Sequence, residues 1–249
     1  MVSGKYSALA GAISREQSIN NIAANLANVN TTGYKRSLVS FESLLNGERQ
    51  TKEASGINYS RVRQNYTDFS EGALRPTENP YDMAIQGEGF FKVQGPEGPL
   101  YTRRGDFLVD QEGNLRTTDG LPVLDDGNGE ITIPNTDIGE VAVSDEGGIY
   151  ILTPDGNRAE VAQLAVVGVN DTSQLKRRQD TTFELLPGGE ETEVENYSIV
   201  QGSLEVSNVN MTDEMAKMIN SYRTFETYHK VLKSYSTLGE EQNDLGTIS

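Results

Sequence analysis

Near its C-terminal end the chain reads NMTDEMAKMINSYRTFETYHKVLKSYS, residues 210–236. Large side chains recur there at alternating steps of four and three residues. They are Met211, Met215, Met218, Tyr222, Phe225, His229 and Leu232, with Ile219 beside them. Such alternation is typical of a helix that supercoils around another helix. We therefore predict a C-terminal helix that Thr212 caps, that fades near Gly239 and that packs one face against a partner.

The N-terminal end supplies a candidate partner helix. Residues from about 5 to 29 are rich in alanine, and apolar residues recur there at steps of three and four. One face carries Ala12, Ile19, Ile22, Leu26 and Val29, with Leu9 and Ile13 beside it. The helix should end near residues 28–33, where turn-forming residues cluster and Gly33 can adopt a positive φ. We predict that the two terminal helices pair as a coiled coil.

The rest of the chain predicts β structure. Residues 34–79 are mixed and polar, which indicates an extended connector with short strands. From residue 80, short apolar runs alternate with turns rich in glycine, aspartate and asparagine. The predicted strands are 83–85, 90–93, 100–102, 107–109, 131–133, 141–143, 149–152, 161–169, 183–186 and 197–200. This spacing is typical of an antiparallel β domain, either a sandwich or a barrel-like sheet.

The expected fold is therefore α+β and mainly β. The predicted parts are an N-terminal helix within residues 1–33, the connector at 34–79, a β-rich domain at 80–204 and a C-terminal helix within 205–249. The two terminal segments together would form one helical domain, because a helix with a partial apolar face gains most of its stability by packing.

Composition excludes several classes of protein. The chain has 249 residues, no cysteine and a formal net charge of −16. Residues 80–200 hold 23 acidic and 8 basic side chains, so no basic stripe is present and we expect no nucleic-acid partner. Without cysteine, neither a disulfide nor a thiolate metal site can form. Because no run approaches the roughly 20 apolar residues of a membrane span, we expect neither direct membrane insertion nor a cleaved signal peptide.

Candidate catalytic and metal-binding residues are few. The single histidine, His229, lies within the helical pattern, where a packing or interface role is expected. The acidic pairs at 125–126 and 190–191 and the basic run at 176–178 are expected in solvated loops or at strand ends. Residues 110–114 share part of a calcium loop but lack its full ligand spacing, so we predict a hairpin turn. We therefore expect no catalytic site, metal or cofactor.

Three segments carry a family resemblance. Residues 25–35 read NLANVNTTGYK, residues 84–93 read AIQGEGFFKV and are followed at 101–107 by YTRRGDF, and residues 201–210 read QGSLEVSNVN. They resemble the N-terminal, middle and C-terminal signatures of the bacterial flagellar rod and hook proteins. The three occur in the family's order and, with the predicted helices, span the whole chain.

The resemblance implies a structural subunit of the basal-body rod rather than an enzyme. Its terminal helices would pair, its β domain would point outward, and it would polymerise with copies of itself and with the rod subunits above and below. It also implies passage through the flagellar type III export apparatus to the periplasmic rod. The expected assembly residues are Leu9, Ile13, Ile19, Ile22, Asn25, Leu26, Asn28, Val29, Met211, Met215, Met218, Ile219, Tyr222, Phe225, His229 and Leu232.

Several alternatives remain open within and outside this resemblance. The length is shorter than that of hook proteins, and the opening YSALAGA at residues 6–12 is more similar to the proximal than to the distal rod proteins. A distal rod or hook-type subunit is the nearest alternative. A carbohydrate-active β enzyme would need convergent acids in a cleft, and a soluble binding module would use the helices for a simple dimer.

Overall fold

The computed structural model describes residues 2–45, 58–134, 140–152 and 158–246. Two compact units divide the chain. The helical unit comprises residues 1–27, 37–68 and 209–249, and the β unit comprises residues 28–36 and 69–208. The described elements are mainly β strands in antiparallel sheets, with one long helix at each end of the chain. This agrees with the fold class predicted from the sequence.

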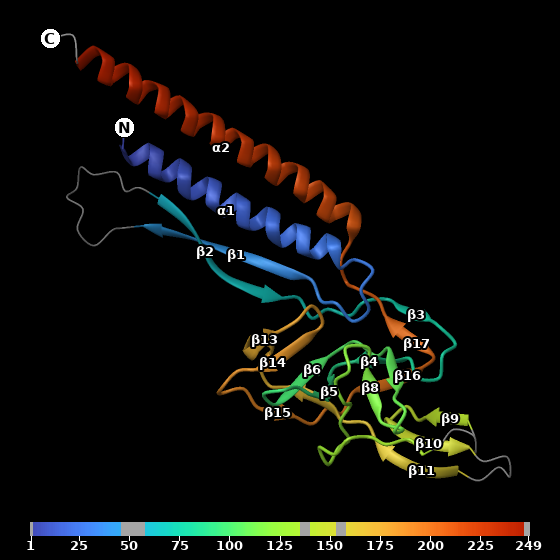
Figure 1. Ribbon diagram of the computed structural model, residues 1–249. Helices are drawn as coiled ribbons and strands as arrows, with labels where there is room; N and C mark the ends of the chain where they lie inside the picture. The colour runs from blue at the N-terminus through green and yellow to red at the C-terminus, as the bar shows by residue number, and fades with distance from the viewer. Residues whose placement is uncertain (1, 46–57, 135–139, 153–157, 247–249) are drawn as a thin grey trace. The chain divides into compact units, whose positions relative to one another are not determined.

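The helical unit contains helices α1 (Val2–Ala27) and α2 (Met211–Gly246) and strands β1 (Ser37–Leu45) and β2 (Asn58–Thr67). α1 contacts α2 and also the antiparallel hairpin that β1 and β2 form (Figure 1). The predicted connector thus contains a hairpin of 9- and 10-residue strands, and its residues 46–57 lie outside the described part. Within the described part, no helix is long and apolar enough to cross a membrane.

Helix α2 begins two residues earlier than predicted. The backbone N–H of Asp213 donates to the side-chain oxygen of Asn210 at 3.2 Å, so Asn210 rather than Thr212 caps the helix. Asp213 and Glu214 lie in the first turn, where negative charge is favourable. α2 also continues to Gly246, past the predicted end near Gly239.

The largest sheet of the β unit has six strands in the order β13-β14-β6-β5-β12-β15. Their bounds are β13 (Leu175–Arg177), β14 (Thr182–Leu185), β6 (Pro99–Thr102), β5 (Phe90–Gln94), β12 (Val166–Val169) and β15 (Glu191–Thr192). Every neighbouring pair is antiparallel. The short 3-10 helix η2 (Thr172–Gln174) precedes β13.

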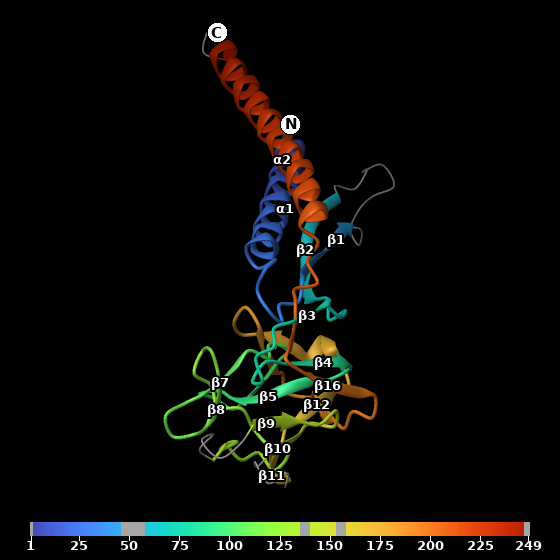
Figure 2. The same cartoon turned by 90° about the vertical axis from the view of Figure 1, so that its right-hand side faces the viewer.

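The remaining described strands form a three-stranded sheet and three pairs (Figure 2). The sheet is β11 (Arg158–Gln163), β10 (Gly148–Leu152) and β9 (Glu140–Val143), and the pairs are β16 (Tyr197–Gln201) with β4 (Met83–Gly87), β17 (Ser203–Glu205) with β3 (Leu74–Pro76), and β7 (Phe107–Val109) with β8 (Leu115–Thr117). Two predictions need correction. The run 161–169 is divided between β11 and β12. Residues 131–133 are buried at Ile131 and Ile133 but form a single isolated bridge, between Thr132 and Asn114.

Strand β5 explains how the six-stranded sheet is packed. Successive strand residues point to opposite faces, and Phe90 and Phe91 belong to different apolar clusters. Phe91 packs edge-on to Phe107 in the larger cluster, with ring centroids 5.2 Å apart. Phe90 joins Phe183 in the smaller one. Both faces of β5 are therefore covered, which is why its first four residues are all buried.

Candidate assembly interface

Two glycines of α1 lie directly against tyrosines of α2. A methyl group on Gly4 would lie 2.5 Å from the hydroxyl oxygen of Tyr235, and one on Gly11 would lie 2.5 Å from the ring of Tyr228. Side-chain carbon atoms do not approach other heavy atoms so closely. Each ring therefore occupies space that only glycine leaves open, although glycine lowers the helix propensity of α1.

Asn25 connects α1 to two other elements of the helical unit. Its side-chain oxygen accepts from the backbone N–H of Ser37 at 2.9 Å, and its amide nitrogen donates to the Ser37 carbonyl at 2.9 Å and to Glu214 Oε2 at 3.3 Å. Glu214 on α2 is 2% exposed and also binds Lys217 at 2.7 Å. Because a buried carboxylate without partners is costly, these contacts stabilise the point where α1, β1 and α2 meet.

The contacts between the helices advance by seven residues in opposite directions. The observed contacts pair Gly4 with Tyr235, Gly11 with Tyr228 and Asn25 with Glu214. The same spacing places Ser18 opposite Ser221 between the last two. At the intermediate step, Ser18 and Ser221 are both buried. The two helices are therefore antiparallel, and the same faces remain in contact over three heptads.

The shielded face of α2 repeats at the predicted steps of four and three residues, but it consists of a different set of residues. Its shielded side chains are Glu214, Met218, Ser221, Phe225, Tyr228, Leu232 and Tyr235, again at steps of four and three. Met218, Phe225 and Leu232 belong to the predicted row as well. In contrast, the predicted members Met211, Met215, Tyr222 and His229 are exposed. The two sets differ because Ser221 and Glu214 are shielded although they are polar, and a pattern of apolar residues does not include them.

Two rows of apolar side chains face solvent in this unit. The α1 outer row is Tyr6, Leu9 and Ile13, which are 43–54% exposed, and the α2 outer row is Met211, Met215, Ile219 and Tyr222, which are 46–61% exposed. The other predicted assembly residues lie elsewhere: Ile22 is buried, Ile19 and Leu26 are half-buried within α1, and Asn28 and Val29 follow the helix as half-buried residues. Exposed apolar rows of this kind are candidate contact surfaces.

The β unit contains a buried ionic cluster that the sequence analysis did not identify. Lys35 Nζ lies 2.6 Å from Glu205 Oε1 and donates to the Ser70 carbonyl at 2.8 Å. The backbone N–H of Gly72 donates to the same Glu205 oxygen at 2.7 Å, and Arg103 lies 3.6 Å from the other. Lys35, Glu205 and Arg103 are all at least 96% shielded. Burial lowers the pKa of Lys35 and of Arg103.

Neighbouring backbone contacts hold the same segments together. The Gly33 N–H donates to the Glu205 carbonyl at 2.8 Å, and the Arg36 N–H donates to the side-chain oxygen of Asn208 at 2.7 Å. Asn208 in turn donates to the Ser70 carbonyl at 3.0 Å. Gly33 has a φ of 69°, the left-handed conformation expected from the sequence. Residues 33–36, 70 and 205–208 are thus tied to one another inside the β unit.

The side chain of Arg177 contacts Tyr34, the residue before Lys35. Its guanidinium lies 4.7 Å from the centre of the Tyr34 ring and 4.8 Å from that of the Phe183 ring, and it also donates to the Lys35 carbonyl. Burial lowers the pKa of Arg177. The basic run was predicted in a solvated loop or at a strand end, and Arg177 is the last residue of β13. Its guanidinium is nevertheless partly shielded from water by the two rings.

The ionic cluster joins the three segments that carry the family resemblance. Lys35 ends the first segment, Arg103 lies in the middle one and Glu205 lies in the last. The one feature of the sequence that could have indicated this cluster is that each segment holds a charged residue among glycines and apolar residues. Buried charges occur mainly in pairs, but the sequence alone does not show that residues 35, 103 and 205 meet.

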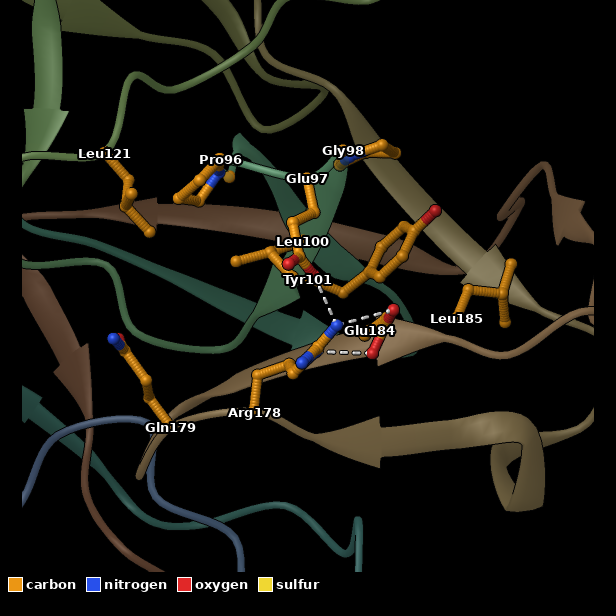
Figure 3. Close-up of a pocket in the computed structure, with 12 residues that line it drawn as sticks. Pro96, Glu97, Gly98, Leu100, Tyr101, Leu121, Arg178, Gln179, Glu184 and Leu185 are labelled. Atoms are coloured by element: carbon orange, nitrogen blue, oxygen red, sulfur yellow. Dashed lines mark hydrogen bonds and ion pairs between the residues drawn. The ribbon is translucent and has the colours of Figure 1, made fainter.

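A pocket of about 580 Å³ lies beside the turn between β5 and β6 (Figure 3). Leu100, Tyr101 and Leu185 supply apolar walls, and Glu97 and Glu184 supply carboxylates. Both carboxylates bind the guanidinium of Arg178, at 2.6 and 2.5 Å. Arg178 thus compensates both acids and links the β5–β6 turn to the β13–β14 turn. This arrangement leaves neither glutamate as a free acid or base for catalysis.

Metal and catalytic candidates can be placed as well. Within the described ranges, no group of three or more histidine, aspartate or glutamate side chains is arranged to hold a metal ion. His229 is exposed and packs edge-on to Phe225, with ring centroids 4.5 Å apart. Asp110 closes the predicted hairpin turn between β7 and β8 by accepting from the backbone N–H groups of Glu112 and Asn114.

Comparison with known proteins gives matches along the chain. Family models match residues 6–35 (flagella basal body rod protein), 84–151 (flagellar hook protein FlgE/F/G D1 domain) and 200–245 (flagellar basal body rod FlgEFG protein C-terminal). The FlgF rod protein of Caulobacter vibrioides is 33% identical over 251 residues, 98% of each chain. FlgF of Rhizobium meliloti is 32% identical over 94% of this chain and 93% of its own. FlgG of Agrobacterium fabrum is 32% identical over 90% and 92%.

Proposed function

Because this chain belongs to the family of flagellar basal-body rod proteins, as a structural subunit of the rod, we propose that it is built into the rod through the outer rows of its two terminal helices. Its neighbours are copies of itself and the rod subunits above and below. The proposal assigns no enzymatic activity, nucleic-acid partner or membrane insertion to the chain, and it includes export by the flagellar type III apparatus.

The observation that carries this proposal is the placement of the two outer rows. The α1 outer row begins at Tyr6, near the glycine–tyrosine contacts, whereas the α2 outer row begins at Met211, near the contact between Asn25 and Glu214. The rows therefore lie toward opposite ends of the antiparallel helix pair. When the α1 row of one copy packs on the α2 row of the next, the contact joins unlike surfaces, and such contacts continue into a helical array instead of closing.

The energy expected from this contact suits a repeated assembly. A large apolar side chain contributes roughly 1.5–3 kcal/mol when it is transferred completely from water. The seven outer-row side chains are already about half shielded, so each contributes a fraction of that. A single contact of this kind is weak, and the association gains strength because each copy within the array makes the contact twice.

The experiment separates contacts between copies from contacts within one copy. Met215→Glu and Leu9→Glu place a charge in each outer row, whereas Met218→Glu places one on the shielded face of α2. Thr212→Glu is the matched control, because Thr212 is an exposed polar residue of the same helix. Each variant replaces the native protein in the bacterium that encodes it, and basal bodies are isolated and immunoblotted for the chain.

We expect the outer-row variants to keep their circular dichroism spectrum and midpoint of unfolding and to be absent from basal bodies. Met218→Glu should lower the midpoint as well, and Thr212→Glu should be incorporated normally. Normal incorporation of Met215→Glu and Leu9→Glu, with the chain present at normal levels, would contradict the proposal.

Within the rod we propose a proximal, FlgF-like position, with a distal FlgG-like or a hook-type position as the alternative. The support is the opening at residues 6–12, since the FlgF and FlgG relatives reach similar identities. Complementation distinguishes the positions. The chain should restore swimming to a strain that lacks its proximal rod protein and not to one that lacks its distal rod protein. The reverse result would assign the distal position.

A further inference from the structure

We propose that the contact between Asn25 and Glu214 fixes the register in which α1 and α2 pair. The proposal goes beyond the assembly function, because it concerns a single chain. A helix pair whose contacts repeat every seven residues can slide by one heptad and restore much of its packing. Met218, Phe225 and Leu232 recur at that interval on the shielded face of α2. Apolar packing alone therefore does not select one register.

The glycine–tyrosine contacts oppose a slide in one direction only. If each α1 residue meets the α2 residue seven positions further along, Tyr228 moves from Gly11 to Ser18, where a side chain occupies the space that the ring needs. If the slide is in the other direction, Tyr228 moves to Gly4, another glycine, and Gly11 receives the small Ser221. This second slide, here called the permissive slide, meets no steric obstacle at these positions.

The polar contact opposes the permissive slide. It would move Glu214 from Asn25 to Ser18, away from the amide that now donates to it at 3.3 Å. Asn25 cannot follow, because two hydrogen bonds of 2.9 Å tie its side chain to the backbone of Ser37. The slide would leave a buried carboxylate and a buried amide without each other, and an unmatched buried polar group is destabilising. One buried asparagine can specify register in this way.

The register has a consequence for the two outer rows. Since a helix rises 1.5 Å per residue, a slide of one heptad displaces α2 along α1 by about 10 Å. The α1 outer row, Tyr6 to Ile13, and the α2 outer row, Met211 to Tyr222, would change their spacing by that amount. This last step depends on the proposed function, whereas the role of Asn25 and Glu214 in register does not.

The absence of native cysteine allows a direct test by disulfide formation. Ser18→Cys with Ser221→Cys reports the native register. Ser14→Cys with Met218→Cys reports the permissive slide, and Ser14→Cys with Leu232→Cys reports the obstructed one. Pairs seven residues out of register are too far apart for the short Cα separation that a disulfide requires. Each pair is introduced into the parent chain and into N25L/E214L, and the purified monomer is oxidised under mild conditions.

In the parent chain we expect the native-register disulfide to form in large excess over the other two. In N25L/E214L the disulfide of the permissive slide should rise roughly tenfold, as expected when about one buried hydrogen bond no longer distinguishes the registers. The disulfide of the obstructed slide should stay at its parent level, because Tyr228 still meets Ser18. A merely structural role would lower the midpoint of unfolding without this directional change.

Matched controls keep the result interpretable. N20L/E226L changes the same residue types on the same helices at exposed positions, and it should leave all three disulfides unchanged. Glu214→Gln preserves an acceptor for Asn25 and should keep the native register. If N25L/E214L is folded by circular dichroism and forms only the native-register disulfide, then chain connectivity or apolar packing sets the register and the proposal is wrong.

Discussion

The Nζ atom of Lys35 lies 2.6 Å from Oε1 of Glu205, and each of these side chains is only 1% exposed. Removing Lys35 takes away the closest counter-charge of the buried Glu205 carboxylate, which Arg103, 3.6 Å from its other oxygen, compensates only in part. We therefore expect Lys35→Met to lower the free energy of unfolding by about 3–5 kcal/mol. Urea unfolding followed by tyrosine fluorescence measures the change, since the chain has 11 tyrosines and no tryptophan.

Glu205→Leu provides the comparison, because it leaves two buried cations, Lys35 and Arg103, without the carboxylate they share. It should therefore lower the free energy of unfolding by more than Lys35→Met does. Lys176→Met is the matched control, since Lys176 is an exposed lysine on β13. A Glu205→Leu variant as stable as Lys35→Met would show that the charge balance does not govern this cluster.

A second prediction concerns two glycines with positive φ. Gly33→Ala and Gly120→Ala both place a side chain in the left-handed conformation, which costs about 1–2 kcal/mol. A methyl group on Gly120 would meet no atom within 4 Å, whereas one on Gly33 would lie 2.4 Å from the backbone nitrogen of Arg104. Gly33→Ala should therefore lower stability by roughly 1–3 kcal/mol more than Gly120→Ala. Equal midpoints of thermal unfolding would contradict the close approach.

A third prediction compares adjacent arginines. Arg177 lies between the rings of Tyr34 and Phe183, whereas Arg178 binds two glutamates at the surface. Lysine keeps the charge but loses the planar group that stacks on rings. Arg177→Lys should lower the free energy of unfolding by about 1–2 kcal/mol, measured by urea unfolding. Arg178→Lys should have little effect, and a loss of similar size there would indicate that stacking is not the cause.

A fourth prediction concerns pH. The guanidinium of Arg116, 2.5 Å from Asp110, and the backbone N–H groups of Asn114 and Glu112 lower the pKa of Asp110 from 3.8 to about 2. Because the pKa is lower in the folded chain, the stabilisation is fully present above about pH 4 and is lost as pH falls toward 2. Carbon-13 NMR titration of the carboxyl should show this midpoint. Arg116→Gln should raise the pKa, and an unchanged midpoint would exclude the ion pair as its main cause.

The sequence contained enough information for both helices and for most strands. Spacing of four and three predicted α2, and β-rich runs such as 90–93 and 149–152 matched β5 and β10. The sequence pattern did not predict which residues of α2 face α1, since this depends on the size of the side chains as well as on their polarity. Gly11 is buried because Tyr228 covers it, and nothing in the local sequence of α1 indicates that ring.

The ionic cluster was missed for a related reason. In the sequence alone, each of Lys35, Arg103 and Glu205 has the character of an exposed charged residue. They are buried only because the topology brings together segments that are 170 residues apart in the case of Lys35 and Glu205. For the hairpin of β1 and β2 the sequence predicts only short strands in a connector, because Ser37–Leu45 mixes polar and apolar residues without strict alternation. The length of β1 is set by its pairing with β2 and not by its sequence pattern.

The pairing of α1 with α2 also has a consequence for biosynthesis. Asn25 and Glu214 are 189 residues apart, so the first helix leaves the ribosome long before its partner has been translated. Helices in proteins gain most of their stability by packing against other elements, and the glycines of α1 weaken this helix further. The helical unit can form only after translation has reached the last helix. Order of translation thus delays completion of the helical unit until α2 has been synthesised.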